Sequence, residues 1–589
     1  AIAAGVITVT MLAVFATHAA HAQSAVVAAG VVGDGTPGSC SEATLTAALA
    51  TGGTITFNCG GPKTILILSE KSITHNTSID GGGIITITGG LTTRLFTTVP
   101  GAGTALDIRN ITLDSAFSNN ASGAAIRAFG PLTMTNVVVQ NSTAAPGYCG
   151  GAVLIAGDAL ITNSTFNKNT AALGGGAICT RSLPTNSVQV LDSLFINNQA
   201  TDATTGLGGA LYADGSSKVS VIDSVFLLNA AHFGGAAYVG PSAALTLQGS
   251  PTSSISASKM QLNANSASED GGALYNKGGA LTIDNAVVTV NRTPTQTVLA
   301  GYGGAIYNEG VLALTNSIVS QNQGRFGGGV FVGNSIAGAR AVIDHVSFRL
   351  NTSGSLGGAV YTNIATTTVT ISNSSFSSNT AATGGGLARF NAGLRIENSS
   401  FTQNTATAGG GMYLAAGPSP TSGPYVRVQN VTVSGNTASS NQGGGILNVG
   451  RVELYSMTII SNTNGVYSGN QGNTRFRDTV LQNAGSLNCD GDGSAQISDD
   501  AKNFSTDSSC PLPNSQTGTG LDPKLGPLTV DQRGGTSYFM PLAGSPLINA
   551  GFNCLDYDQI GATRPDACDI GALEFGGRLP RAFLPVVMK

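Results

Sequence analysis

The stretch GGAICTRSLPTNSVQVLDSLFINNQATDATTGLGGALY, residues 175–212, contains the two landmarks that decide the fold of this chain. The first landmark is a glycine pair followed by a small residue and an apolar residue, and it stands at both ends of the stretch. The second landmark is an Asn or Asp followed by a short apolar strand and another Asn, as in DSLFINN from Asp192. Landmarks that return at a regular interval indicate a repeat architecture before any other fold.

Both landmarks return at intervals of about 28 residues, the length of one turn of a solenoid. The glycine pair recurs at positions 150, 175, 208, 271, 303 and 357. Apolar runs between the landmarks are short and are separated by Gly, Asn, Ser and Thr, which favours strands over helices. The sequence therefore predicts an all-β chain, a single-stranded right-handed parallel β-helix (a β-solenoid) of about thirteen rungs with a cap at each end.

Strand parity predicts a bend in each repeat at the first Asn or Asp. The residue two positions before Asn163 and the residue three positions after it are Ile161 and Phe166, both apolar. Strict alternation would put these side chains on opposite faces, so a left-handed residue at the bend must restore the phase. The predicted stacked column of bend residues consists of Asn163, Asp192, Asp223, Asn285, Asn316, Asp344, Asn373, Asn398 and Asn430.

Export is indicated by the N-terminal segment and by the cysteines. Residues 1–22 are mostly apolar and end in the small-x-small form Ala20-His21-Ala22, which predicts a signal peptide; the alternative is a retained apolar segment, the single expected contact with a membrane. An even number of cysteines beside an export signal predicts disulfides, and sequence-local pairing is favoured. The predicted pairs are Cys40 with Cys59, Cys149 with Cys179, Cys489 with Cys510, and Cys554 with Cys568.

The predicted organisation follows the repeats. A short helix after Ser41, with Leu45 and Leu49 on one face, is expected to form a lid at the N-terminal end of the rod. The non-repeating region near the other end is expected to fold over the last rung. The predicted units are residues 1–22, the signal or retained segment; 23–109, the N-terminal cap and first rungs; 110–485, the repeats; 486–575, the C-terminal cap region; and 576–589, the tail.

Two families share these motifs. The pairs GGAL at 208 with FINN at 195, and GGAV at 357 with FSSN at 376, resemble the repeats of chlamydial polymorphic outer-membrane proteins. The motifs LDPKLGPL at 521, SPLINAG at 545, DQIGATRP at 558 and CDIGALEF at 568 resemble the C-terminal part of bacterial choice-of-anchor Q proteins, whose β-helix is pectin-lyase-like. These resemblances imply an exported bacterial protein displayed at the cell surface.

A search for catalytic and metal-binding patterns gives no strong candidate. Glycoside hydrolysis needs two carboxylates about 5 to 9.5 Å apart, and Asp192 and Asp223 share a column, but Asp there replaces the Asn of the bend. The acidic segment from Asp490 is the one candidate for calcium, and it lacks the Gly and Glu of an EF-hand loop. We expect no catalytic residue and no cofactor; a polysaccharide lyase or glycoside hydrolase is the alternative.

One charged face stands out on the predicted rod. Positions three and one before the bend point outward and carry charged side chains in the last repeats. One interpretation is a mixed-sign ladder that keeps the face soluble and prevents lateral pairing. The other is a glycan-binding face with Arg forks and with Tyr455 stacked on a sugar. The residues of this charged face are Arg395, Glu397, Arg427, Glu453, Tyr455, Arg475 and Arg477, with Gln429 between them.

The expected function follows from these patterns. A net charge of −4 with 10% charged residues gives no electrostatic footprint for nucleic acid. We expect a secreted or cell-surface, non-catalytic adhesin, structural or assembly protein. Its expected partners are cell-surface or extracellular-matrix components, including glycan, and further copies of the chain in an extracellular filament.

Overall fold

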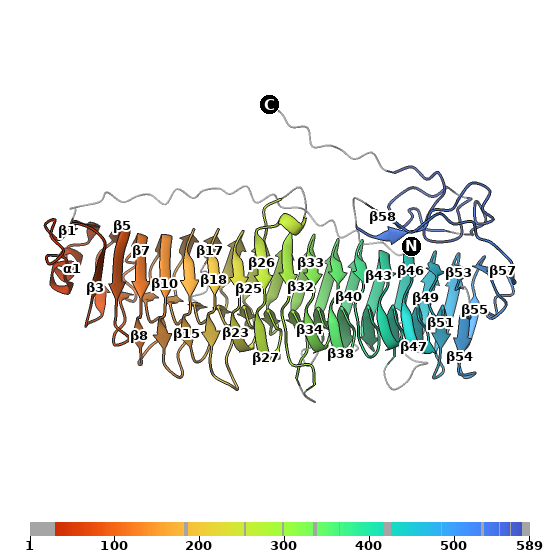
Figure 1. The fold of residues 1–589 in the computed structure, drawn as a ribbon, viewed down its shortest axis with the longest axis horizontal. Helices are drawn as coiled ribbons and strands as arrows, with labels where there is room; N and C mark the ends of the chain where they lie inside the picture. Colours follow the sequence, from red (N-terminus) through yellow and green to blue (C-terminus); the bar gives the residue numbers. More distant parts are fainter. Residues whose placement is uncertain are drawn as a thin grey trace, which may run out of the picture.

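The computed structural model describes residues 30–579 except 182–186, 252–254, 297–299, 334–338, 364–365, 417–425, 484–485, 532–534, 553 and 566. Within these residues the chain is a parallel β-solenoid of about 17 turns, so the estimate of thirteen rungs was too low. The sequence runs from one end of a long rod to the other (Figure 1). The predicted signal segment, residues 1–22, and residues 580–589 of the tail lie outside the described residues.

Three parallel strand columns build the rod. The column before the bend runs from β1 (Gly30–Val32) to β55 (Gln496–Asp499), and the column after it from β3 (Lys63–Leu66) to β57 (Gln516–Thr517). A third sheet of 16 strands follows the glycine pairs, from β4 (Lys71–Ile73) to β54 (Cys489–Gly491). A short fourth sheet lines the turn between the second and third columns, from β8 (Phe117–Ser118) to β47 (Thr437–Gln442).

The solenoid extends beyond the predicted repeat region of residues 110–485 at both ends. β1 pairs with β2 (Gly53–Phe57), and β2 with β5 (Thr77–Thr88), all parallel. At the other end β53 (Val480–Gln482) pairs with β56 (Phe504–Ser505), and β56 with β57. Backbone pairing needs only alternating inward residues, so it continues where the glycine and FxxN landmarks have faded from the sequence.

The phase slip predicted at the bend is present. Ile161 of β13 (Ala159–Thr162) and Phe166 of β14 (Thr165–Asn167) are both fully buried, although five positions separate them. Phe166 stacks on Phe195, and Phe195 on Phe226, with ring centroids 5.0 and 4.6 Å apart. A column of stacked rings therefore fills the core behind the bend and fixes the register of neighbouring rungs.

A continuous ladder of buried asparagines follows these rings, at the last position of each FxxN motif. Asn351 shows the pattern: its Oδ1 accepts hydrogen bonds from the main-chain N–H and the Nδ2 of Asn322 at 3.1 and 3.0 Å. Its Nδ2 donates to the Val319 carbonyl at 2.9 Å and to Asn379 Oδ1 at 3.0 Å. Sequence reasoning placed the amide ladder at the first Asn of the repeat and missed this one. Its members are Asn169, Asn198, Asn229, Asn265, Asn291, Asn322, Asn351, Asn379, Asn404, Asn436, Asn462, Asn483 and Asn488.

The N-terminal end is closed as the sequence predicts. Helix α1 (Glu42–Leu49) begins after Ser41, whose side chain accepts a hydrogen bond from the Thr44 N–H. Leu45 and Leu49 are buried, and α1 packs against β1 and β4. All four predicted cysteine pairs are bonded, with Cα–Cα distances of 5.6, 5.7, 4.9 and 6.3 Å in chain order.

The C-terminal region departs from the prediction. Residues 525–579, here the C-terminal module, lie along the flank of the rod above the last rungs instead of over its end (Figure 1). Cys510 and Leu512, which also belong to the predicted cap region of residues 486–575, are buried in the core at the end of the rod, as predicted. Leu547 and Ile570 of the module pack on the outer side of β53 and β56. The flank is favoured because the bend residues there offer polar partners that the apolar end of a solenoid lacks.

Candidate functional site: the charged face beside the bend

The bend column forms as predicted at eight of its nine positions. Asn163, Asp192, Asp223, Asn285, Asn316, Asn373, Asn398 and Asn430 all have positive φ between 46° and 51°. Asp344 was wrongly placed in this column, because the left-handed residue of its rung is His345, with φ 54°. Asp344 is instead the last residue of β36 (Arg340–Asp344).

The spacing of the apolar residues could have identified His345. Phe348 lies three positions after His345 and four after Asp344, whereas the repeat requires three. Ile343 is accordingly buried and Val342, which the predicted register turned inward, is 48% exposed. Asp344 Oδ2 lies 2.8 Å from His345 Nδ1, and this hydrogen bond raises the pKa of the imidazole despite its partial burial.

The two outward charged columns are in register on consecutive rungs. Arg395 of β43 (Gly393–Thr402) pairs with Arg427 of β46 (Val426–Ser434). Arg427 pairs with Glu453 of β49 (Arg451–Tyr455), and Glu453 with Arg475 of β52 (Asn473–Arg477). The second column stacks in the same way, in the order Glu397, Gln429, Tyr455 and Arg477.

Ion pairs join the charged side chains in two groups. Arg395 lies 2.8 Å from Glu397, and Arg427 lies 3.1 Å from Glu453. Arg475 contacts Glu453 at 3.7 Å and Asp500 at 2.8 Å, so Glu453 is shared between two guanidinium groups. The side chains of Arg395 and Arg427 are about half exposed, while that of Glu453 is 11% exposed. The carboxylates therefore lie beneath and the guanidinium groups form the outer surface.

Tyr455 does not fit the alternative in which its ring stacks on a sugar. It is 8% exposed, and the guanidinium groups of Arg477 and Arg427 lie 4.0 and 5.5 Å from the centre of its ring. Burial, with the nearby Glu453 carboxylate, raises the pKa of its hydroxyl. Tyr455 thus holds the arginines in place, as a cation–π partner does, and presents little of its ring to a ligand.

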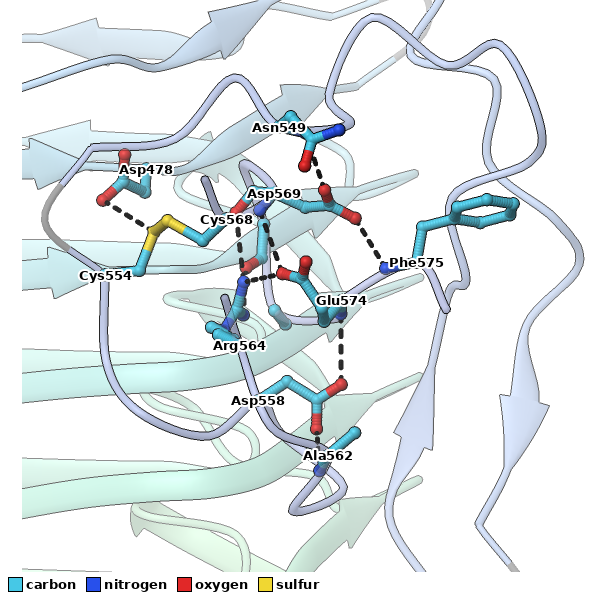
Figure 2. A network of polar contacts seen from close by, with 12 residues as sticks. Asp478, Asn549, Cys554, Asp558, Ala562, Arg564, Cys568, Asp569, Glu574 and Phe575 are labelled. Carbon is cyan, nitrogen blue, oxygen red and sulfur yellow. Dashed lines mark hydrogen bonds and ion pairs between the residues drawn. A yellow bond between two sulfur atoms is a disulfide. The ribbon is translucent and has the colours of Figure 1, made fainter. Parts of the chain in front are cut away.

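A buried polar network lies within the C-terminal module (Figure 2). Arg564, with a side chain 1% exposed, contacts Glu574 Oε2 at 3.3 Å and donates to the carbonyls of Asp569 and Gly571 at 3.0 and 2.7 Å. Asp558 accepts hydrogen bonds from three main-chain N–H groups, among them that of Glu574. The DQIGATRP and CDIGALEF motifs are therefore the two halves of one structural network.

Two recesses lie on the surface of the described residues, one at the turn after the second column and one beside the bend. A polar groove of about 660 Å³ lies where the fourth sheet ends at β47, and its lining includes Asn441, Asn464 and Asp490. A smaller cleft of about 170 Å³ separates the module from the rod and is lined by His345, Asn398 and residues of the module. Neither recess contains an arginine of the charged face.

The described residues contain no group of three or more His, Cys, Asp or Glu side chains placed to hold a metal ion. In the acidic segment, Asp492 accepts hydrogen bonds from the N–H groups of Ser494 and Asn470 and so closes a turn. Asp192 and Asp223 stand in the bend column, where Asp192 pairs with Lys259 at 3.7 Å. No helix in the described part of the chain is long and apolar enough to cross a membrane.

Comparison with known families gives a partial match. The model described as the Chlamydia polymorphic membrane protein (Chlamydia_PMP) repeat matches residues 163–181 and 192–214, which lie on two neighbouring rungs. A search of curated proteins found no match to this chain. The repeat match and the four disulfides together indicate an extracytoplasmic protein.

Solved structures with similar folds include both enzymes and an adhesin. The periplasmic alginate epimerase AlgG is 10% identical, with 74% of this chain and 77% of that chain covered and a TM-score of 0.26. PfbA, a surface adhesin of Streptococcus pneumoniae, is 12% identical over 87% and 99% of the two chains, with a TM-score of 0.23. A PL6 alginate lyase in complex with a trisaccharide is 11% identical over 85% and 88%, with a TM-score of 0.29. At these values the role has to be argued from the side chains.

Proposed function

We propose that this protein is a surface-displayed, non-catalytic adhesin that binds an extended acidic glycan along its charged face. The observation that carries the proposal is the set of half-exposed guanidinium groups of Arg395, Arg427 and Arg475, held in register by ion pairs and by Tyr455. Rungs of a parallel β-helix repeat every ~4.8 Å, so Arg395 and Arg427 offer cations one rung apart, and Arg475 offers a third cation two rungs further along, to a polymer with spaced anions.

The arginines can bind a second anion without leaving their carboxylates. Each guanidinium carries five N–H donors in a planar fork, and Arg395 uses its Nε and Nη2 on Glu397. Arg427 uses the same two nitrogens on Glu453. The outer edge of such a fork suits a carboxylate or a sulfate, which it can bind through two parallel hydrogen bonds. These carboxylates fix the direction of each fork and reduce the entropy lost on binding.

The test is binding of immobilised full-length protein to polygalacturonate and to chondroitin sulfate, with dextran as the neutral control. We expect binding of the acidic polymers that weakens with salt and a loss of at least tenfold in Arg427→Ala. Arg349→Ala is the matched control, because Arg349 is an exposed arginine on β37 (Ser347–Arg349), outside the charged face. Equal affinity for dextran, or an equal effect of both substitutions, would contradict the glycan assignment.

The enzyme alternative is tested in the same incubations. A lyase acting on polygalacturonate would produce unsaturated chain ends that absorb in the ultraviolet. We expect no increase in absorbance and no new reducing ends. Turnover that disappears in Arg475→Ala would overturn the non-catalytic assignment and place a reaction on the charged face.

A further inference from the structure

The C-terminal module is fastened to the rod by contacts between residues far apart in the sequence. The Ser537 N–H donates to Ser400 Oγ at 2.9 Å, and the Ala572 N–H donates to Thr458 Oγ1 at 3.0 Å. Asn430 of the bend column donates to the Tyr557 carbonyl at 2.8 Å. These are single polar contacts, and the apolar packing of Leu547 and Ile570 on the rod accompanies them.

The module and its contact with the rod together bury more acidic than basic groups. Asp478 is the left-handed residue at the last bend, is fully buried, and accepts a hydrogen bond from the Phe552 N–H of the module at 2.8 Å. Asp558, Asp569 and Glu574 of the module are at most 3% exposed. The side-chain cations that face them, among the described residues, are Arg564 within the network (Figure 2) and Arg477, whose Nε lies 3.9 Å from Asp478 Oδ2.

Burying this excess of carboxyl groups costs less free energy when some of them are protonated. Desolvation raises the pKa of Glu574 to about 7 and that of Asp478 to about 6, against the opposing effect of main-chain hydrogen bonds. Burial also raises the pKa of Asp558 and of Asp569. An ionised carboxylate that leaves water without a full set of partners costs several kcal/mol, so ionisation opposes docking.

A second contact, at the other end of the module, also favours docking at low pH. His345 of the rod lines the cleft under the module, together with Asp531 and Gln559 of the module. Its hydrogen bond to Asp344 and the nearby Asp531 carboxylate both raise the pKa of the imidazole. A protonated His345 attracts Asp531 across the cleft, and this attraction disappears when the imidazole loses its proton.

We propose that the C-terminal module is an acid-closed strap, which holds to the flank of the rod in mildly acidic medium and releases from it in alkaline medium. Release would uncover the bend residues from Asn398 to Asp478 and the apolar outer side of β53 and β56. The inference concerns the flank and does not depend on glycan binding at the charged face.

The sign of the pH dependence follows from the direction of the shifts. A carboxyl group whose pKa is higher when docked binds more protons in the docked state, so docking is strongest below the free pKa and weakens as the pH rises through the docked pKa. With a pKa of about 6 when docked and 3.8 when free, Asp478, which the module covers, weakens docking by about tenfold between pH 5 and pH 8. His345 adds to this loss.

The experiment is hydrogen–deuterium exchange of the full-length protein at pH 5.5 and pH 8.5, corrected for the intrinsic exchange rates. We expect peptides from residues 535–579 to lose at least tenfold of their protection at pH 8.5, while α1 and the central rungs keep theirs. In the double variant Asp478→Asn, Glu574→Gln, protection should change much less with pH. Asp202→Asn, at an exposed turn of the rod, is the control and should behave as the parent.

A locked variant keeps the proposal testable if the double variant folds poorly. Ser400→Cys with Ser537→Cys would place two thiols where a hydrogen bond now joins the module to the rod. Oxidised, this variant should show the same protection at both pH values. Equal protection of residues 535–579 at pH 5.5 and 8.5 in the parent protein, or greater protection at pH 8.5, would overturn the strap.

Discussion

The buried asparagine ladder should dominate the stability of individual rungs, and Asn351→Ala tests this. The substitution removes the acceptor of the Asn322 main-chain N–H and the amide donor to the Val319 carbonyl. Asn322 Nδ2 keeps its hydrogen bond to the Val288 carbonyl, and the Asn351 N–H keeps Asn379 Oδ1. Two main-chain groups therefore lose a buried partner.

The expected magnitude follows from this accounting. A buried donor or acceptor left without a partner costs about 1 to 3 kcal/mol, so we expect Asn351→Ala, which leaves two such groups, to lower the local free energy of opening by about 2 to 6 kcal/mol. The matched control is Asn163→Gly, at an exposed bend position with φ 46°. Glycine tolerates that backbone conformation, and a loss of less than about 0.5 kcal/mol is expected there.

Native-state hydrogen exchange is the suitable assay, because a repeat array need not unfold in a two-state transition. The loss should appear in peptides from residues 311–390, on the rungs adjoining Asn351, and fade toward both ends of the rod. A loss below about 1 kcal/mol, or one no larger than that of Asn163→Gly, would show that the ladder is a consequence of stacking and contributes little to it.

Two further predictions concern the bend and the N-terminal lid. His345→Val should lower the thermal unfolding midpoint, whereas His345→Gly should not. The reason is that a β-branched residue at φ 54° carries a backbone cost of about 1 to 2 kcal/mol. Equal midpoints for the two variants would refute the left-handed assignment of this residue. Replacing Cys40 and Cys59 by serine opens a loop of 19 residues and should lower the stability of the lid by about 3 kcal/mol. We expect faster hydrogen exchange in α1 and unchanged hydrogen exchange in the central rungs. Unfolding of the whole rod would instead show that the lid is essential for folding.

The local geometry of the repeat could be predicted from sequence because the same spacing of apolar residues around the bend recurs on many rungs. Ile161, Asn163 and Phe166 fix one bend, and the same spacing on later rungs confirms it. The error at Asp344 arose from residue type, since Asp commonly adopts the left-handed conformation and His does so less often. Spacing from Phe348 was the stronger signal, because packing of the core sets the phase and the bend residue adapts to it.

The ends and the flank could not be predicted in the same way. β1, β56 and β57 carry no FxxN motif, so their membership of the solenoid is visible only in the backbone pairing. The position of the module depends on contacts between residues up to 137 positions apart, for which no periodic pattern exists. The register of the charged columns was predictable because it follows from counting back from the bend, whereas the burial of Tyr455 depends on the conformations of two long arginine side chains.

The rungs of the rod are similar, yet the module docks on particular ones. The outward residues of the column after the bend distinguish these rungs. From Ser400 through Thr432 to Thr458 these residues are polar, and at Val480 and Phe504 they become apolar.

The module matches this order with a Ser537 N–H, the Gln559 carboxamide oxygen and an Ala572 N–H, followed by the apolar Leu547 and Ile570. A slip by one rung would set Val480 against the Ala572 N–H and leave that buried donor without a partner, at a cost of about 1 to 3 kcal/mol. The repeats thus form the rod, and the change from polar to apolar outward residues along it determines the rungs on which the module docks.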